Sequence, residues 1–193
     1  ELSPGQRELA EAVCKANANV VFVLSGGAPF RISRGARAIV HGYLGGQAGS
    51  EAMADVLLGD VNPSGKLNET WPLALEDTPC YDYFPSKERT SEYRESVYVG
   101  YRYYDTAGVP VRYPFGFGRS YTSFAYSDLT VNEECVSFTL KNVGDRDGSE
   151  VAQLYVSAPG RLLFRPKKEL KGFTKVFLKA GEEKRVEITL DDK

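Results

Sequence analysis

The stretch that decides the fold is "GYLGGQAGSEAMADVLLGDVNPSGKL", residues 42–67, in which a glycine-rich turn runs into a helical pattern. Gly59 stands where a helix end favours a residue with positive φ. The apolar residues on one side of the predicted helix are Ala52, Met53, Val56 and Leu57. The glycine turn could bind a phosphate group, or it could only allow tight packing.

The spacing of the turn argues against phosphate. A P-loop places Lys and Ser or Thr directly after its last glycine, and a dinucleotide fold has G-x-G-x-x-G. The segment "GGQAG", residues 45–49, matches neither pattern. We therefore expect Gly45 and Gly46 to permit a tight turn. We expect three small residues to let the helix approach the sheet closely: Ala48, Gly49 and Ala52.

The preceding residues alternate helix and strand signals. Ser3 is a possible N-cap with Pro4 at the first helical position. The apolar residues that follow at helical spacing are Leu9, Ala12, Val13 and Ala16. The continuous apolar run Val20–Leu24 predicts a strand buried on both faces of a parallel sheet, and residues 37–46 repeat the arrangement.

The predicted order is thus helix, strand, strand, helix, with glycines at the carboxyl ends of both strands. This order indicates part of an open α/β sheet. In such sheets, ligands bind beyond the carboxyl ends of the strands. The Gly26-Gly27 and Gly45-Gly46 turns would lie at that edge.

Residues 62–121 are rich in Pro, Gly and Tyr, and we expect a packed, irregular segment that covers a neighbour. Lys66 is expected to be solvated. Glu92, Glu95 and Asp105 could form a carboxylate pair near a carbohydrate only if the fold brings them together. A polar, aromatic seam between domains is the favoured interpretation of this region.

From about Phe124 the pattern becomes all-β, with five alternating segments separated by turn signals. This pattern predicts a β-sandwich of the immunoglobulin or fibronectin III-like class. Such a sandwich has about seven strands, and a two-strand α/β unit cannot close a core, so both ends of the chain look cut or are completed by another chain. The basic run Arg165–Phe173 is expected to be a solvated strand entry rather than a nucleic-acid patch.

Composition excludes several classes of function. A net charge of −2 and a pI of about 5.6 argue against nucleic acid, and no apolar run is long enough for a membrane span. His41 is the only histidine, so a Ser-His-Asp triad or a His-rich metal site is not expected. Three widely spaced cysteines are expected to be reduced, half-buried thiols: Cys14, Cys80 and Cys135. The chain does not begin with Met, and the compartment, cytoplasmic or secreted, stays open.

Several long motifs, in order, resemble one family. "YLGGQAGSEAMADVLLGDVNPSGKLNETWP", "YVGYRYYD", "YPFGFGRSYTSFAYSDL" and "GSEVAQLYVSAP" are similar to successive segments of glycoside hydrolase family 3, chiefly β-glucosidases. The resemblance implies a catalytic barrel, then an α/β sandwich, then a fibronectin type III-like domain. It implies domains at 1–75 (later α/β sandwich), 76–121 (connecting segment) and 122–193 (an incomplete fibronectin-like sandwich).

The resemblance also implies a retaining mechanism, with an Asp nucleophile and a Glu acid/base about 5 Å apart. The motifs that carry both residues fall outside this segment, so no catalytic, substrate-binding or metal residue is assigned. No cofactor is expected. The sequence departs from the family pattern around Arg34, where an aromatic is usual, and at Ser96 and Arg119, where Gly and Leu are common.

The function implied is that of a segment of a β-glucosidase-type hydrolase, whose partners are a β-glucoside or cello-oligosaccharide and the remaining domains or chain of the same enzyme. The enzyme could equally be permuted, nicked or split. Alternatives within the class are a β-xylosidase, an N-acetylglucosaminidase or another exo-glycosidase. The alternative from another class is a non-catalytic carbohydrate-binding or interaction module.

Overall fold

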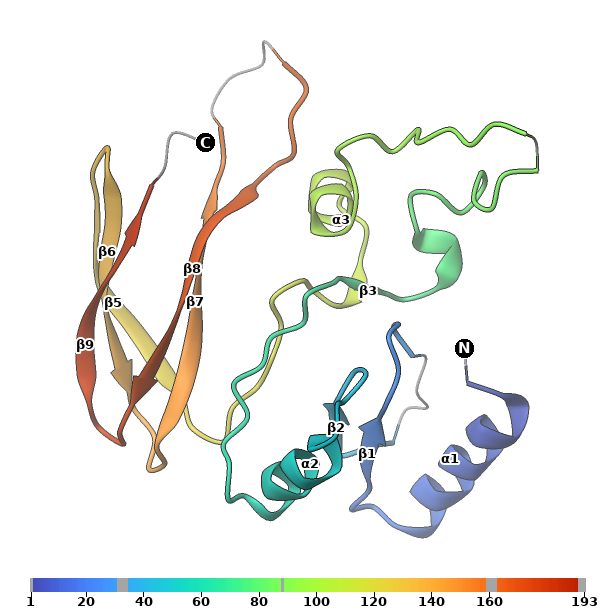
Figure 1. The fold of residues 1–193 in the computed structure, drawn as a ribbon, viewed down its shortest axis with the longest axis horizontal. Helices are drawn as coiled ribbons and strands as arrows, with labels where there is room; N and C mark the ends of the chain where they lie inside the picture. The colour runs from blue at the N-terminus through green and yellow to red at the C-terminus, as the bar shows by residue number, and fades with distance from the viewer. Residues whose placement is uncertain (1, 31–34, 88, 159–162, 191–193) are drawn as a thin grey trace. The chain divides into compact units, whose positions relative to one another are not determined.

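The structure is a computed structural model that describes residues 2–30, 35–87, 89–158 and 163–190 (Figure 1). The chain divides into two compact units, Glu1–Val61 and Asn62–Lys193. The first unit is mixed α/β, and the second contains a connecting segment and an all-β sandwich. This mixed architecture agrees with the predicted fold class.

The first unit has the predicted order of elements: α1 (Pro4–Ala16), β1 (Val21–Leu24), β2 (Ala38–His41) and α2 (Gly49–Leu58). Helix α1 begins with a capping box, in which the Ser3 side chain accepts from the Gln6 N–H and the Gln6 side chain accepts from the Ser3 N–H. Strands β1 and β2 pair in parallel, from Val21 opposite Ala38 to Leu24 opposite His41. The two strands form the parallel sheet that the sequence predicts.

Packing in this unit differs in detail from two expectations. Within this chain, β1 is covered on one face only, and Val21 and Val23 are each 47% exposed. A Cβ added at Gly49 would meet nothing within 4 Å, while the Gly49 Cα itself lies 3.3 Å from where a Cβ at Gly45 would stand. The close approaches lie instead at Gly42, where a Cβ would overlap the methyl group of Met53, and at Gly45. Both contacts join the turn to helix α2, through the Met53 side chain and the Gly49 Cα.

Helix α2 ends as predicted. Gly59 adopts φ 86°, and its N–H donates to the carbonyls of Asp55 and Val56. A side chain rarely adopts this left-handed conformation, so glycine at this position ends the helix without backbone strain.

The segment 62–121, expected to be irregular, contains more regular structure than the sequence predicts. It includes β3 (Trp71–Pro72), a 3₁₀ turn η1 (Leu75–Asp77), α3 (Tyr101–Ala107) and β4 (Val111–Tyr113). Strand β3 pairs antiparallel with β4, and Trp71 is only 2% exposed. The segment is therefore anchored at its start by a buried tryptophan.

The sandwich has the five strands that the alternation predicts: β5 (Phe124–Val131), β6 (Cys135–Asn142), β7 (Gly148–Val156), β8 (Glu169–Leu178) and β9 (Glu183–Thr189). One sheet has the order β5-β6-β9, and the other pairs β7 with β8 (Figure 1). All pairings are antiparallel. Inward-facing side chains of the two sheets form the core: Phe138, Leu140, Ala152, Leu178, Val186 and Ile188.

Cys14, Cys80 and Cys135 are free and half-buried, as expected. Among the described residues, no helix is long and apolar enough to cross a membrane.

Candidate functional site

The carboxyl edge of the parallel sheet in the first unit holds a strained residue. Tyr43 follows β2 with φ 51°, a conformation that non-glycine residues rarely adopt. Its carbonyl accepts hydrogen bonds from the N–H of Gly26 at 2.9 Å and from Ser25 Oγ at 3.2 Å. The turns after β1 and β2 therefore meet at this edge, as the sequence predicts.

Aromatic rings line the same edge. The His41 ring lies 4.0 Å from the ring of Tyr43 and 6.1 Å from that of Phe30, measured between centroids. Burial lowers the pKa of His41. The neutral imidazole of His41 therefore packs between the rings of Tyr43 and Phe30. Arg34, where the sequence departs from the family pattern, lies outside the described residues.

A second candidate region lies in the other unit, where α3 contacts the end of the sandwich. The backbone N–H of Leu170 donates to the Tyr101 hydroxyl at 2.8 Å, and that of Lys167 donates to Thr106 Oγ1 at 2.9 Å. Arg102 and Glu169 form an ion pair at 3.4 Å. These contacts fix α3 against the residues that lead into β8.

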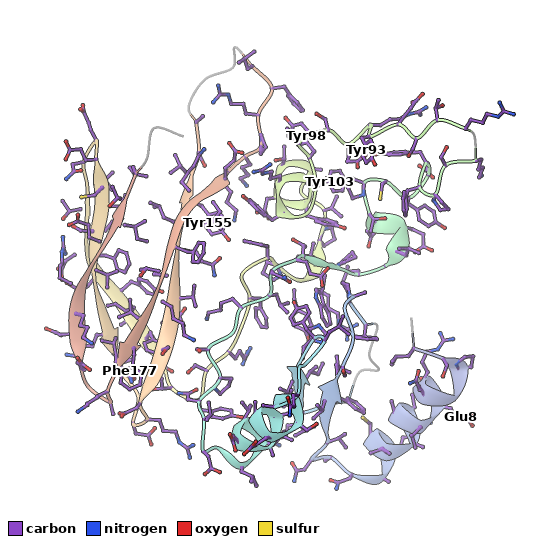
Figure 2. All side chains as sticks on the ribbon, viewed as in Figure 1. Glu8, Tyr93, Tyr98, Tyr103, Tyr155 and Phe177 are labelled. Atoms are coloured by element: carbon purple, nitrogen blue, oxygen red, sulfur yellow. The ribbon has the colours of Figure 1, made fainter. Side chains whose placement is uncertain are left out.

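Aromatic rings complete this contact, which we call the α3 seam. The ring of Tyr101 lies 5.0 Å from that of Phe115 and 5.7 Å from that of Tyr155 on β7. The ammonium group of Lys168 lies 5.0 Å from the centroid of the Tyr155 ring. Figure 2 shows Tyr155 beside the β7–β8 sheet. The arrangement is the polar, aromatic seam that the sequence favours, and Lys168 is engaged in it while its side chain stays 41% exposed.

The three candidate carboxylates have different partners. Asp105 pairs with Lys168 at 3.0 Å, within the α3 seam. Glu92 pairs with Arg94 at 2.7 Å, and both side chains are mostly exposed. Glu95 lies beside Tyr83, whose pKa is raised first by burial and then by this carboxylate. None of these described contacts is the facing pair of carboxyl groups, about 5 Å apart, that a retaining glycosidase uses.

Lys66 corrects an expectation, because it is not solvated. Its side chain is 15% exposed, and its ammonium group donates to Glu150 Oε2 and to the Gly118 carbonyl, each at 3.0 Å. Glu150 also helps burial raise the pKa of Tyr126 to about 12. Lys66 is therefore a structural cation that ties the N-P-S-G-K motif to the sandwich.

Asn62 has a role that the sequence did not indicate. Its side-chain amide donates to the Asp147 carbonyl at 2.9 Å, and its oxygen accepts from Ser120 Oγ and the Tyr121 N–H. The only sequence signal was the Asn-Pro turn itself, which does not say what an asparagine side chain will reach. Asn62 and Lys66 together fasten one short motif to two distant segments, residues 118–121 and 147–150.

Metal ligation finds no support in the described part of the chain, which holds no cluster of three or more His, Cys, Asp or Glu side chains suited to an ion.

The departure at Ser96 has a structural counterpart. Ser96 adopts φ 50°, a conformation that glycine reaches without strain. Arg119 is exposed.

Comparison with known proteins gives two family matches. The model of the glycosyl hydrolase family 3 C-terminal domain matches residues 1–121, and that of the fibronectin type III-like domain matches residues 150–193. These matches account for the α/β unit, the connecting segment and the later strands of the sandwich.

Two curated relatives illustrate the range of the family. Thermostable beta-glucosidase B of Acetivibrio thermocellus is 48% identical over 96% of this chain and 26% of its own length. Exo-alpha-(1->6)-L-arabinopyranosidase of Bifidobacterium breve is 46% identical over 97% of this chain, again 26% of its own length. The chain thus spans about a quarter of the curated relatives it matches.

Solved structures agree. A GH3 beta-glucosidase of Bifidobacterium adolescentis matches the whole chain and 30% of its own, with a TM-score of 0.93 and 43% identity. Beta-glucosidase of Kluyveromyces marxianus, solved in complex with glucose, matches 98% of this chain and 24% of its own, with a TM-score of 0.92 and 44% identity. The chain therefore belongs to glycosyl hydrolase family 3, whose C-terminal domain model matches residues 1–121.

Proposed function

We propose that this chain is a segment of a retaining β-glucosidase-type glycoside hydrolase that cleaves terminal β-D-glucosyl residues. One observation carries the proposal: β-glucosidases match nearly the whole chain at up to 48% identity, with TM-scores up to 0.93. The substrate would be a β-glucoside or a cello-oligosaccharide. No cofactor is part of the proposal, because this hydrolysis needs only two carboxyl groups and water.

The role proposed for these residues is support. The two reacting carboxyl groups would belong to other parts of the enzyme, and the α/β unit would present its carboxyl edge to them, since ligands of open α/β sheets bind there. Asp105 pairs with Lys168, and Glu92 pairs with Arg94. These ion pairs support the proposal that neither carboxylate is a reacting group. The remaining domains of the same enzyme would be this chain's partners.

The domain boundaries 1–75, 76–121 and 122–193 belong to the same proposal. The end of the first family match at residue 121 and the start of β5 at Phe124 support the second boundary. The first boundary stays a prediction, and the compact units divide nearby, between Val61 and Asn62.

A second candidate is another exo-glycosidase activity of the same family. The arabinopyranosidase of Bifidobacterium breve is almost as similar to this chain as the β-glucosidase of Acetivibrio thermocellus, at 46% against 48% identity. The two identities differ by two percentage points, so sequence similarity favours both substrates almost equally. Fold and family support sugar cleavage more firmly than they support the choice of sugar.

The test uses the full-length protein that contains this chain. Rates are compared on p-nitrophenyl β-D-glucopyranoside, β-D-xylopyranoside and α-L-arabinopyranoside, and the anomer first released is followed by NMR. The proposal predicts the highest kcat/KM on the glucoside and release of β-glucose. Preference for a pentopyranoside would favour the second candidate, and absence of hydrolysis with all three would favour a non-catalytic module.

A further inference from the structure

Two unfavourable features meet at the carboxyl edge of the parallel sheet. Tyr43 adopts φ 51°, and strained residues of this kind persist where their surroundings hold them and gather at binding and catalytic sites. The next residue, Leu44, is 79% exposed, so its apolar side chain gains little from folding. A strained residue thus places an apolar side chain in solvent, at the edge where ligands of open α/β sheets bind.

The two turns at this edge hold Leu44 in a defined place. The Tyr43 carbonyl accepts hydrogen bonds from the Gly26 N–H and from Ser25 Oγ, which tie the turn after β2 to the turn after β1. The Leu44 side chain lies beside Gly27, since its Cδ1 is 3.6 Å from the position of a Cβ added there. A side chain held in this way can contact a ligand with little further loss of conformational freedom.

The residues around Leu44 indicate which part of a glycoside it would meet. Residues 25–30 and 41–48, the described turns of this edge, contain no Asp, Glu, Lys or Arg. A glucosyl unit presents hydroxyl groups, whose burial is unfavourable unless they find hydrogen-bond partners. An aryl or alkyl leaving group presents apolar carbon instead, and its burial against Leu44 is favourable.

We propose that Leu44 contacts the leaving group of the substrate and favours glycosides whose leaving group is apolar. This inference rests on the proposed function, in which the carboxyl edge faces the reacting carboxyl groups. When the bond between the anomeric carbon and the glycosidic oxygen breaks, that oxygen takes a proton from the acid/base carboxyl group and departs with the leaving group. Leu44 takes no part in the proton transfer and is a specificity-determining residue.

A ratio of rates in the full-length protein tests this role. The two substrates are p-nitrophenyl β-D-glucopyranoside and β-D-glucosyl fluoride, which share the sugar and differ in the size of the leaving group. We expect Leu44→Ser to lower kcat/KM on the aryl glucoside about tenfold relative to the fluoride, the lower end of what a lost apolar contact changes. Leu44→Ala should lower the ratio in the same direction, and Leu44→Met, which keeps the apolar volume, should retain it.

Leu58→Ser is the matched control. Leu58 is 78% exposed in the same unit, but it is the last residue of α2, roughly 13 Å along the helix from Gly49. Its ratio should equal that of wild type. An unchanged ratio in Leu44→Ser and Leu44→Ala would overturn the inference. If kcat/KM then falls equally on both substrates and the unfolding midpoint drops, Leu44 is a contact between domains instead.

This outcome is separable from a failure of the proposed function. Wild-type hydrolysis of either substrate supports the glycosidase, and the ratio then decides the role of Leu44. A wild-type protein that cleaves neither substrate removes the proposed function, and this inference with it.

Discussion

At the scale of single residues, the most direct prediction concerns the replacement of Lys66. Lys66→Met leaves the Glu150 carboxylate, itself only 16% exposed, without its cation. Breaking one side of a buried pair typically costs about 3 kcal/mol or more. We expect Lys66→Met to lower the unfolding free energy of the sandwich by about this amount, measured by denaturant unfolding of the full-length protein.

The control for Lys66 is a double variant. Lys66→Met with Glu150→Leu removes both charges, and apolar replacements for a buried pair are often nearly neutral. We expect the double variant to be more stable than Lys66→Met alone. Equal losses in the two variants would show that the cost arises from packing rather than from the unpaired carboxylate.

Glu69 gives a pH-dependent prediction at the same scale. Burial raises the pKa of Glu69, so the folded protein holds this proton more tightly than the unfolded chain does. The unfolding free energy therefore falls as the pH rises from about 4.3, the pKa of Glu in an unfolded chain, through the higher pKa of Glu69 in the folded protein. Above that higher pKa, the unfolding free energy stays lower. Glu69→Gln should remove this fall and be more stable than wild type at neutral pH.

Unfolding curves between pH 4 and pH 8 measure the effect of Glu69→Gln. The exposed Glu76→Gln is the matched control on the same segment. A profile for Glu69→Gln that parallels wild type over this range would contradict the assigned burial effect.

Residue types explain which single positions could be predicted. Ser3, Pro4 and Gly59 act through the local backbone, so their roles follow from sequence. Lys66 was mispredicted because its partners, Gly118 and Glu150, are distant in sequence. The role of Asn62 was missed for the same reason, since its partners lie 58 or more residues away.

At the scale of elements, the hydroxyl group of Tyr101 makes one of the direct hydrogen bonds of the α3 seam. Tyr101→Phe keeps the ring contacts and removes the acceptor of the Leu170 N–H. We expect a loss of about 1 kcal/mol in unfolding free energy, the usual net contribution of one hydrogen bond. Tyr93→Phe, at a side chain that is 81% exposed, is the control and should unfold like wild type. A seam that tolerates Tyr101→Phe without loss would show that the other contacts hold α3 without this hydrogen bond.

Periodicity explains which elements could be predicted. The five sandwich strands alternate apolar and polar residues, and all five form where expected. Helix α3 was missed because "YRYYDTA" is only seven residues long and rich in aromatics, which have no strong helix preference. A continuous apolar run does not say which neighbours cover a strand, and this chain alone covers one face of β1.

At the scale of the whole molecule, the family and the mixed fold could be predicted from ordered motifs, and the comparisons confirm both. The candidate site could be predicted only as a seam. Its two hydrogen bonds join residues 69 and 61 positions apart, Tyr101 with Leu170 and Thr106 with Lys167. No local pattern encodes such pairings, whereas turn chemistry and strand alternation are local.

The central claim is that these residues support a sugar-cleaving site without supplying its reacting carboxyl groups. The direct measurement is kcat on p-nitrophenyl β-D-glucopyranoside for the full-length protein carrying Glu92→Gln, Glu95→Gln and Asp105→Asn together, with circular dichroism to confirm folding. The account predicts a kcat within about tenfold of wild type, because general acid–base groups contribute about 10²–10⁴-fold and none is removed. A folded triple variant whose kcat falls by about a thousandfold or more would contradict it.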